Sequence, residues 1–323
     1  MNKFLLAGKT ANKRKNIAKE EFIMPRVARK KSPDSIYHVM SKSISEVNLF
    51  KDDDDKEKYL EILKGYQDIF YFKVYAYCLM DNHCHFIIDV NGADISKIFH
   101  GVNYKYAMYF NSRYKRHGHL FQDRFKSITV NKDNYLVTLS GYIHANPLSI
   151  EEYSNKVEEY EFSSLGIYLG LREDKYNLMD ETFLMSQFSN KEVDAKRLYL
   201  EFVKQCTDEN IRAKIEFKNE GTEYAGCRTI IARDYSVEKI IEFLCKKLNA
   251  TEADFRIKNC KKTVEKRAIL VLFMRCFCNY TNKEICKVIG NICQSRISSL
   301  CMMGKDLIRN KDEYKGLVQE FAG

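Results

Sequence analysis

The chain has 323 residues, of which 45% are hydrophobic, and it carries a formal net charge of +9. This length favours two domains, and the hydrophobic fraction is ample for packed cores. No apolar run approaches the roughly 20 residues that span a bilayer, and the N-terminus has too short an apolar core for a secretory signal, so the sequence argues against membrane-spanning and secreted proteins.

The spacing of the cysteines indicates the redox environment of the chain, and the distribution of charge indicates the kind of partner that it binds. The eleven cysteines are scattered without a Cys-x-x-Cys pair, which disfavours a zinc ribbon or a disulfide framework and indicates reduced thiols in the cytoplasm. Basic residues gather in two places, because residues 1–34 contain ten Lys or Arg and residues 105–126 contain six. Such clusters predict an anionic partner, most commonly nucleic acid, although an ordinary solvated basic face has the same composition.

In chain order, residues 1–23 are expected to form a basic tail, and Met24 is an alternative start. Residues 24–155 then alternate between strand and helix patterns. The predicted elements are a strand from Ile36, a helix from Asp52–Asp55 to about Phe70, strands over Lys73–Met80 and His83–Val90, a helix from Asp94 to about Arg116, a strand over Ile128–Val130, and a helix from Asp133 to about Ala145. This order is typical of an α+β sandwich with an antiparallel sheet.

The stretch Cys78–Val90 organises this part of the chain, as two apolar strands joined by a polar turn at Asp81-Asn82. Side chains two apart on a strand point to the same face, so His83 and His85 should lie side by side while Cys84 faces the opposite way. Paired imidazoles suit a divalent metal, although each histidine taken alone is more often structural or surface-exposed.

Tyr142 and Asn146 stand four residues apart at the end of the last predicted helix, and this spacing places them on one helical face. The amide oxygen of Asn146 could supply a further metal ligand. A tyrosine with a pKa near 10 is a poor nucleophile alone, but it becomes a plausible one against a phosphodiester polarised by a metal. With 21 tyrosines in the chain, a purely structural Tyr142 is the alternative.

The second half of the chain has a helical sequence pattern, without the alternation of strands and helices seen in residues 24–155. Residues 156–234 are charged and helical without a clear motif, and we interpret them as a connecting segment. Residues 235–315 are predicted to be all-α. Within them, Thr281-Asn-Lys-Glu284 is a capping box that opens a short helix ending at Gly290, and another helix begins at Gln294. This is typical of a helix-turn-helix, although a plain bundle for packing or dimerisation is the alternative.

Several motifs in residues 24–165 occur together and in a fixed order. They are Met24-Pro-Arg, Ile36-Tyr-His-Val, Leu79-Met-Asp-Asn-His-Cys-His-Phe, Gly118-His-Leu-Phe-Gln-Asp-Arg-Phe-Lys-Ser, Tyr142-Ile-His-Ala-Asn-Pro and Phe162-Ser-Ser. With them the chain resembles the single-tyrosine HUH transposases, specifically the subgroup associated with repetitive extragenic palindromes. Residues 235–310 resemble, more loosely, the C-terminal helix-turn-helix domain of the bacterial replication initiator.

The resemblance implies a ferredoxin-like HUH domain over residues 24–155. It implies that His83, His85 and Asn146 bind Mg²⁺ or Mn²⁺, and that Tyr142 attacks single-stranded, hairpin-forming DNA to give a 5′-phosphotyrosine and a free 3′-hydroxyl. Cys84 departs from the family, which usually carries a bulkier apolar residue there. The similarity to the replication initiator implies that the helix from Gln294 binds duplex DNA.

Two surfaces are expected to contact DNA. The basic, aromatic loop before the fourth strand should hold single-strand phosphates through Arg124 and Lys126, next to Gln122, with Phe121 or Phe125 stacking on bases. Gln294, Ser295 and Arg296 should enter a duplex groove. The predicted function is a metal-dependent DNA endonuclease and strand transferase, and the alternative is a non-catalytic DNA-binding regulator derived from a transposase.

Overall fold

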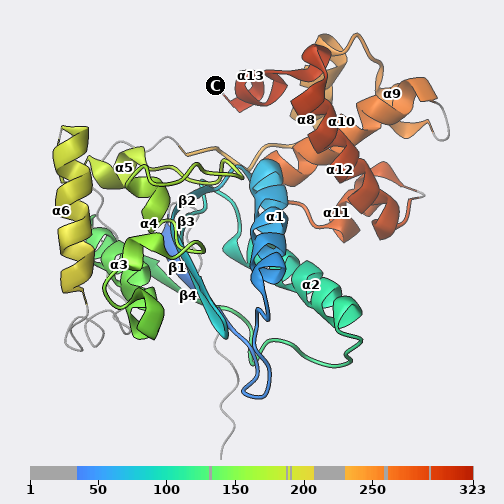
Figure 1. Ribbon diagram of the computed structural model, residues 1–323. Coiled ribbons are helices and arrows are strands. Elements are labelled where there is room, and N and C mark those ends of the chain that lie inside the picture. The colour runs from blue at the N-terminus through green and yellow to red at the C-terminus, as the bar shows by residue number, and fades with distance from the viewer. Residues whose placement is uncertain are drawn as a thin grey trace, which may run out of the picture. The chain divides into compact units, whose positions relative to one another are not determined.

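The computed structural model describes residues 35–130, 133–186, 188–189, 191–206, 230–257, 261–290 and 292–322. The predicted basic tail and the Met24-Pro-Arg motif lie outside the described residues. Figure 1 shows the chain coloured from blue to red along the sequence. We call residues 35–206 the sheet region and residues 230–322 the helical region.

Four strands form the centre of the sheet region: β1 (Ile36–Lys42), β2 (Lys73–Met80), β3 (His83–Asp89) and β4 (Lys126–Val130). Their order across the sheet is β2-β3-β1-β4, and every neighbouring pair is antiparallel. α1 (Asp53–Phe70) connects β1 to β2, and α2 (Ile95–Arg113) connects β3 to β4. Two strand–helix–strand units therefore interleave, which confirms the predicted α+β fold with a ferredoxin-like antiparallel sheet.

Helices cover both faces of this sheet. Figure 1 shows α1 and α2 on one face and α3 (Asp133–Ala145) on the other. Ser41 faces α2, because Asn103 of that helix donates a hydrogen bond to its hydroxyl at 2.9 Å, and the fully buried Cys84 is its partner in register. His83 and His85 flank Cys84 along β3, so they point to the face that carries α3.

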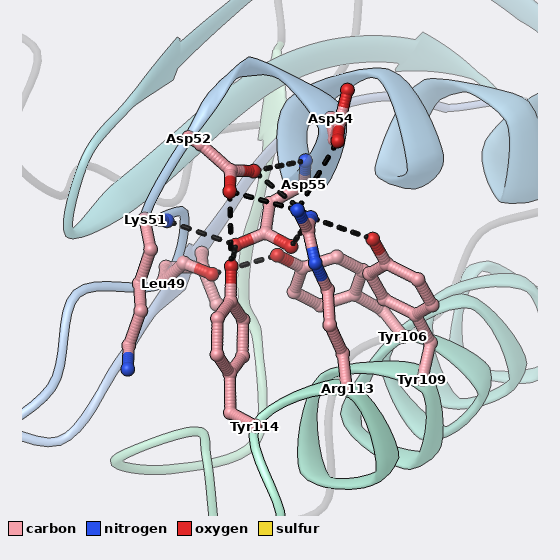
Figure 2. A network of polar contacts seen from close by, with 9 residues as sticks. All are labelled: Leu49, Lys51, Asp52, Asp54, Asp55, Tyr106, Tyr109, Arg113 and Tyr114. Carbon is pink, nitrogen blue, oxygen red and sulfur yellow. Dashed lines mark hydrogen bonds and ion pairs between the residues drawn. The ribbon is translucent and has the colours of Figure 1, made fainter.

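A network of ion pairs at the surface, built around the buried Asp55, connects the start of α1 to the end of α2, as Figure 2 shows. Arg113 bonds Asp55 and Asp52 at 2.8 Å and Asp54 at 3.1 Å. Asp55 is fully buried and also accepts from the Lys51 amide and the Tyr114 hydroxyl, both at 2.9 Å. The acidic first turn of α1 therefore has a structural partner, and Arg113 is occupied although it belongs to the basic cluster that predicts an anionic partner.

We expect Arg113→Met to lower the midpoint of thermal unfolding clearly, because it removes the cation and leaves the Asp55 carboxylate buried. Circular dichroism melts measure this change. Arg124→Met, which removes an exposed arginine of the loop before β4, is the matched control and should leave the midpoint near that of the unmodified chain. An unchanged midpoint in Arg113→Met would show that the network contributes little to stability.

Parts of the segment after α3 pack against that helix, namely η1 (Asn146–Ser149), Ser164 and α6 (Glu192–Gln205). The segment also contains η2 (Glu151–Tyr153), η3 (Val157–Glu159), α4 (Leu165–Tyr168) and α5 (Thr182–Met185). The fully buried His144 of α3 makes a 2.6 Å hydrogen bond with Tyr199 of α6 and a 2.7 Å hydrogen bond with Ser164. Gly141 permits close contact, since a Cβ there would lie 2.6 Å from a ring carbon of Phe202. Part of the segment that we interpret from sequence as connecting thus holds α3 in place.

The helical region contains α8 (Val237–Lys247), α9 (Glu252–Arg256), α10 (Lys261–Phe277), α11 (Asn282–Ile289), α12 (Gln294–Asn310), η4 (Asp312–Tyr314) and α13 (Leu317–Ala322). The predicted capping box at Thr281 and Glu284 is present, and α11 ends at Gly290 with a positive φ of 70°. Residues 235–315 are thus all-α where they are described, as predicted. None of the helices in the described ranges is long and apolar enough to cross a membrane.

Candidate active site

The pairing of β1 with β3 builds the centre of the site. Lys42 is the register partner of His83, and Met40 is the partner of His85. Directly opposite residues of an antiparallel pair share a face, so Lys42 and the two histidines lie on the α3 side of the sheet. On the other edge of β1, Lys126 of β4 pairs with Met40 and joins the same face.

The two histidines of β3 lie as the spacing predicts. The ring centroids of His83 and His85 are 4.9 Å apart and the rings are perpendicular. Burial lowers the pKa of both imidazoles below the usual value, and for His85 the nearby His38 and His83 lower it further. Both rings are therefore neutral near pH 7, and a neutral imidazole keeps one nitrogen lone pair that can bind a metal.

The end of α3 brings Tyr142 and Asn146 to these histidines. The half-buried Tyr142 ring lies 6.0 Å from the His85 ring, in a perpendicular arrangement. The Asn146 amide nitrogen donates to the carbonyl oxygens of Tyr142 at 2.9 Å and Ile143 at 3.2 Å. These bonds hold the amide nitrogen against α3 and leave the amide oxygen free of the helix. A hydrogen bond between the side chains of His83 and Asn146 raises the pKa of His83 and so opposes the effect of burial. The four residues singled out for chemistry thus converge, although β3 and α3 are far apart in sequence.

The side chains of His83, His85 and Asn146 can be compared with the ligands that a divalent metal ion requires. Among the described residues, no group of three or more His, Cys, Asp or Glu side chains could hold a metal ion. Two neutral imidazoles and one amide oxygen are nevertheless present together, and they would leave coordination positions for water and phosphate oxygens. Such an open set fits a catalytic Mg²⁺ or Mn²⁺ better than a closed structural zinc site.

Exposed polar residues line the edge of this site. The loop before β4 continues the sheet, because the Gln122 amide donates to the Lys42 carbonyl at 3.0 Å and Phe121 forms a bridge with Ser43. Gln122, Arg124 and Lys126 are exposed. Lys42 is exposed too, and neither it nor Lys126 forms an ion pair within the described part of the chain. Lys42 was not expected at the site from the sequence, where its only signal is its place two residues beyond Met40 on the same strand face.

One predicted DNA contact is wrong. Phe125 is only 6% exposed, and its ring lies 5.4 Å from that of Phe99 on α2. It fills the core beneath α2 and has no face available for stacking on a base. Phe121 is partly exposed, so it is the aromatic residue of this loop that can meet a nucleotide.

The second predicted DNA surface lies in the helical region. Gln294, Ser295 and Arg296 form the first turn of α12, and all three side chains are exposed. Asn282 of α11 donates to the Ser298 hydroxyl at 2.8 Å, which holds the two helices together at this end. The exposed first turn therefore has the polar, basic chemistry that a groove-reading helix requires.

Comparisons with known proteins concern mainly the sheet region. A family model described as "Transposase IS200 like" matches residues 31–146, a range that includes His83, His85, Tyr142 and Asn146. A solved structure titled "Structure of the REP associates tyrosine transposase bound to a REP hairpin" matches at 14% identity with a TM-score of 0.39, covering 46% of this chain and 89% of that chain. No curated protein matches the chain.

Proposed function

We propose, because residues 31–146 belong to the IS200-like transposase family, that this chain cleaves and rejoins single-stranded DNA with Tyr142 as nucleophile. Membership of the family indicates a transposase-like DNA-processing function. The observation that carries the finer proposal is the convergence of Tyr142 and Asn146 on the His83–His85 pair, with the Tyr142 ring 6.0 Å from that of His85.

In the proposed reaction, the Tyr142 oxygen attacks the scissile phosphorus in line and its proton is lost. The bond from phosphorus to the 3′-oxygen breaks, that oxygen takes up a proton, and the 5′-phosphate stays on Tyr142. A bound Mg²⁺ or Mn²⁺, held by His83, His85 and Asn146, would supply charge neutralisation at the non-bridging phosphate oxygens. Attack of a 3′-hydroxyl on the phosphotyrosine reverses the step without an external energy source, so cleavage and strand transfer share one site.

The edge of the site supports a single strand as substrate. Lys42 and Lys126 place two cations on the face of the histidines, and Gln122, Arg124 and Phe121 continue from them. Phosphates can bind the cations while a base stacks on Phe121, which is the usual chemistry of single-strand binding. A paired duplex would hold the scissile phosphate on a stiff backbone, whereas a single strand can turn it towards Tyr142.

Incubation with labelled hairpin DNA carrying a single-stranded flank tests this proposal. With Mn²⁺ present, we expect a denaturing gel to show a labelled protein–DNA adduct and a shorter DNA strand with a free 3′-hydroxyl. Binding of the hairpin without any adduct, over a range of flank sequences, would contradict the enzyme proposal and favour the non-catalytic regulator.

For the helical region, we propose that α11 and α12 form a helix-turn-helix that binds duplex DNA through Gln294, Ser295 and Arg296. We expect Arg296→Gln to weaken duplex binding and to reduce the slope of log affinity against log salt by about one, as for one lost phosphate contact. Gel-shift titrations at several salt concentrations measure both quantities.

Lys239→Gln, at an exposed site on α8, is the matched control for charge, and its salt slope should equal that of the unmodified chain. Hairpin cleavage should persist in Arg296→Gln. An unchanged duplex affinity and slope in that variant would favour a packing or dimerisation role for these helices.

A further inference from the structure

A third histidine lies next to the pair on β3. His38 of β1 is 8% exposed, and its Nε2 atom lies 2.9 Å from Nδ1 of His85, within hydrogen-bonding distance. The two rings are stacked, with centroids 5.2 Å apart and planes inclined by 21°. The contact is buried and runs diagonally from β1 to β3, where it is flanked by Ile87, the register partner of His38, and Met40, the register partner of His85.

His38 is poorly placed to be a third metal ligand. Its Nε2 atom is already engaged with His85, and no group of three His, Cys, Asp or Glu side chains within the described residues could hold a metal ion. Two ring nitrogens 2.9 Å apart can share only one proton, because two N–H groups directed at each other would clash. The contact therefore joins one N–H to one lone pair, and the direction of the bond decides which nitrogen of His85 is protonated.

The neighbouring His83 indicates the direction of the hydrogen bond between His85 and His38. Its Nδ1 atom lies 2.5 Å from the side-chain oxygen of Asn82, which can only accept. In the metal-binding tautomer Nδ1 therefore carries the proton, and the Nε2 lone pair is left for the metal instead of a proton shared with the Asn146 oxygen. The same arrangement at His85 requires Nδ1–H to donate to His38. With the opposite direction, His85 would carry its proton on Nε2 and could not bind a metal through that atom.

We propose that His38 is a positioning residue that accepts the Nδ1–H of His85 and holds this ring in the tautomer and orientation in which Nε2 is the metal-binding atom. The proposal rests on the proposed function, since it concerns the same metal site. Partners of this kind orient metal-binding histidines, and their removal typically costs about 10- to 100-fold in metal affinity.

Two substitutions of matched length separate this role from packing. His38→Gln retains an oxygen acceptor near the position of Nε2, whereas His38→Met fills similar space without a comparable acceptor. In the metal-free full-length protein, ¹⁵N chemical shifts of the imidazoles should show His85 protonated at Nδ1 in the unmodified chain and in His38→Gln. In His38→Met they should show a mixture of tautomers.

Calorimetric titration with Mn²⁺ provides the second readout. We expect His38→Gln to bind within a few-fold of the unmodified affinity, and His38→Met to bind at least about 10-fold more weakly. If His38→Met fails to fold in thermal melts, His38→Asn replaces it, because its shorter side chain withdraws the acceptor.

Two results would overturn the inference: His85 protonated at Nε2 in the unmodified chain, or unchanged Mn²⁺ affinity in the variant that lacks the acceptor. Absence of Mn²⁺ binding in the unmodified chain would instead contradict the proposed metal site. The ¹⁵N shifts, which need no metal, still report on His38 in that case.

Discussion

Replacement of Tyr142 by phenylalanine should abolish the covalent adduct and reduce strand cleavage by about 10⁴-fold or more, since the substitution removes only the attacking oxygen. The Tyr142 ring is half-buried beside His85, and phenylalanine keeps that ring contact. We therefore expect an unchanged melting midpoint and unchanged hairpin affinity. Denaturing gels measure the adduct, and fluorescence anisotropy measures the affinity.

Two other tyrosines serve as controls for this result. Tyr135 lies on the same helix, where burial raises its pKa, and Tyr104 is 61% exposed on α2, which covers the opposite face of the sheet. Tyr135→Phe and Tyr104→Phe should both retain the adduct. Persistent cleavage in Tyr142→Phe would refute the assignment and direct the search for the nucleophile to these two residues.

Removal of one histidine of the β3 pair should reduce the rate of strand cleavage almost as much as Tyr142→Phe does. We expect His83→Ala or His85→Ala to lower the cleavage rate by about 10³-fold, which corresponds to about 4 kcal/mol in the activation barrier, because metal binding is lost. EDTA should do the same to the unmodified chain, and added Mn²⁺ should restore it. His100→Ala, at an exposed site on α2, is the matched control and should cleave normally.

The pKa values of the pair add a pH dependence to this prediction. Burial lowers the pKa of both His83 and His85, so protons begin to compete with the metal only below the ordinary histidine pKa of about 6.5. Mn²⁺ affinity measured by calorimetry should therefore hold as the pH falls to that value and weaken below it. Full activity in chelator would rule out the metal site, and a loss of affinity well above pH 6.5 would contradict the buried, neutral state of the pair.

Local sequence patterns were enough to predict the elements of the fold and the side-by-side placement of His83 and His85. The period of two along β3 places His83 and His85 on one face, and the period of 3.6 along α3 places Tyr142 one turn before Asn146. Asp52, Thr281 and Pro147 mark helix ends through bonds and steric effects that act within a few residues. The order of strands and helices was enough to predict the antiparallel α+β sheet.

Contacts between distant segments could not be predicted in this way. The register of β1 against β3 brings Lys42 and His38 to the histidine pair across 41 and 47 positions of sequence, and no local periodicity encodes that alignment. Burial likewise depends on what packs above a side chain, so Phe125 turned inward onto α2 although its loop looked like a stacking surface. Hydrogen bonds, strand register and packing between such segments form only in the folded chain. The sequence by itself therefore determined which residues could do chemistry, whereas the tertiary structure decided which neighbours orient them and which basic residues remain exposed.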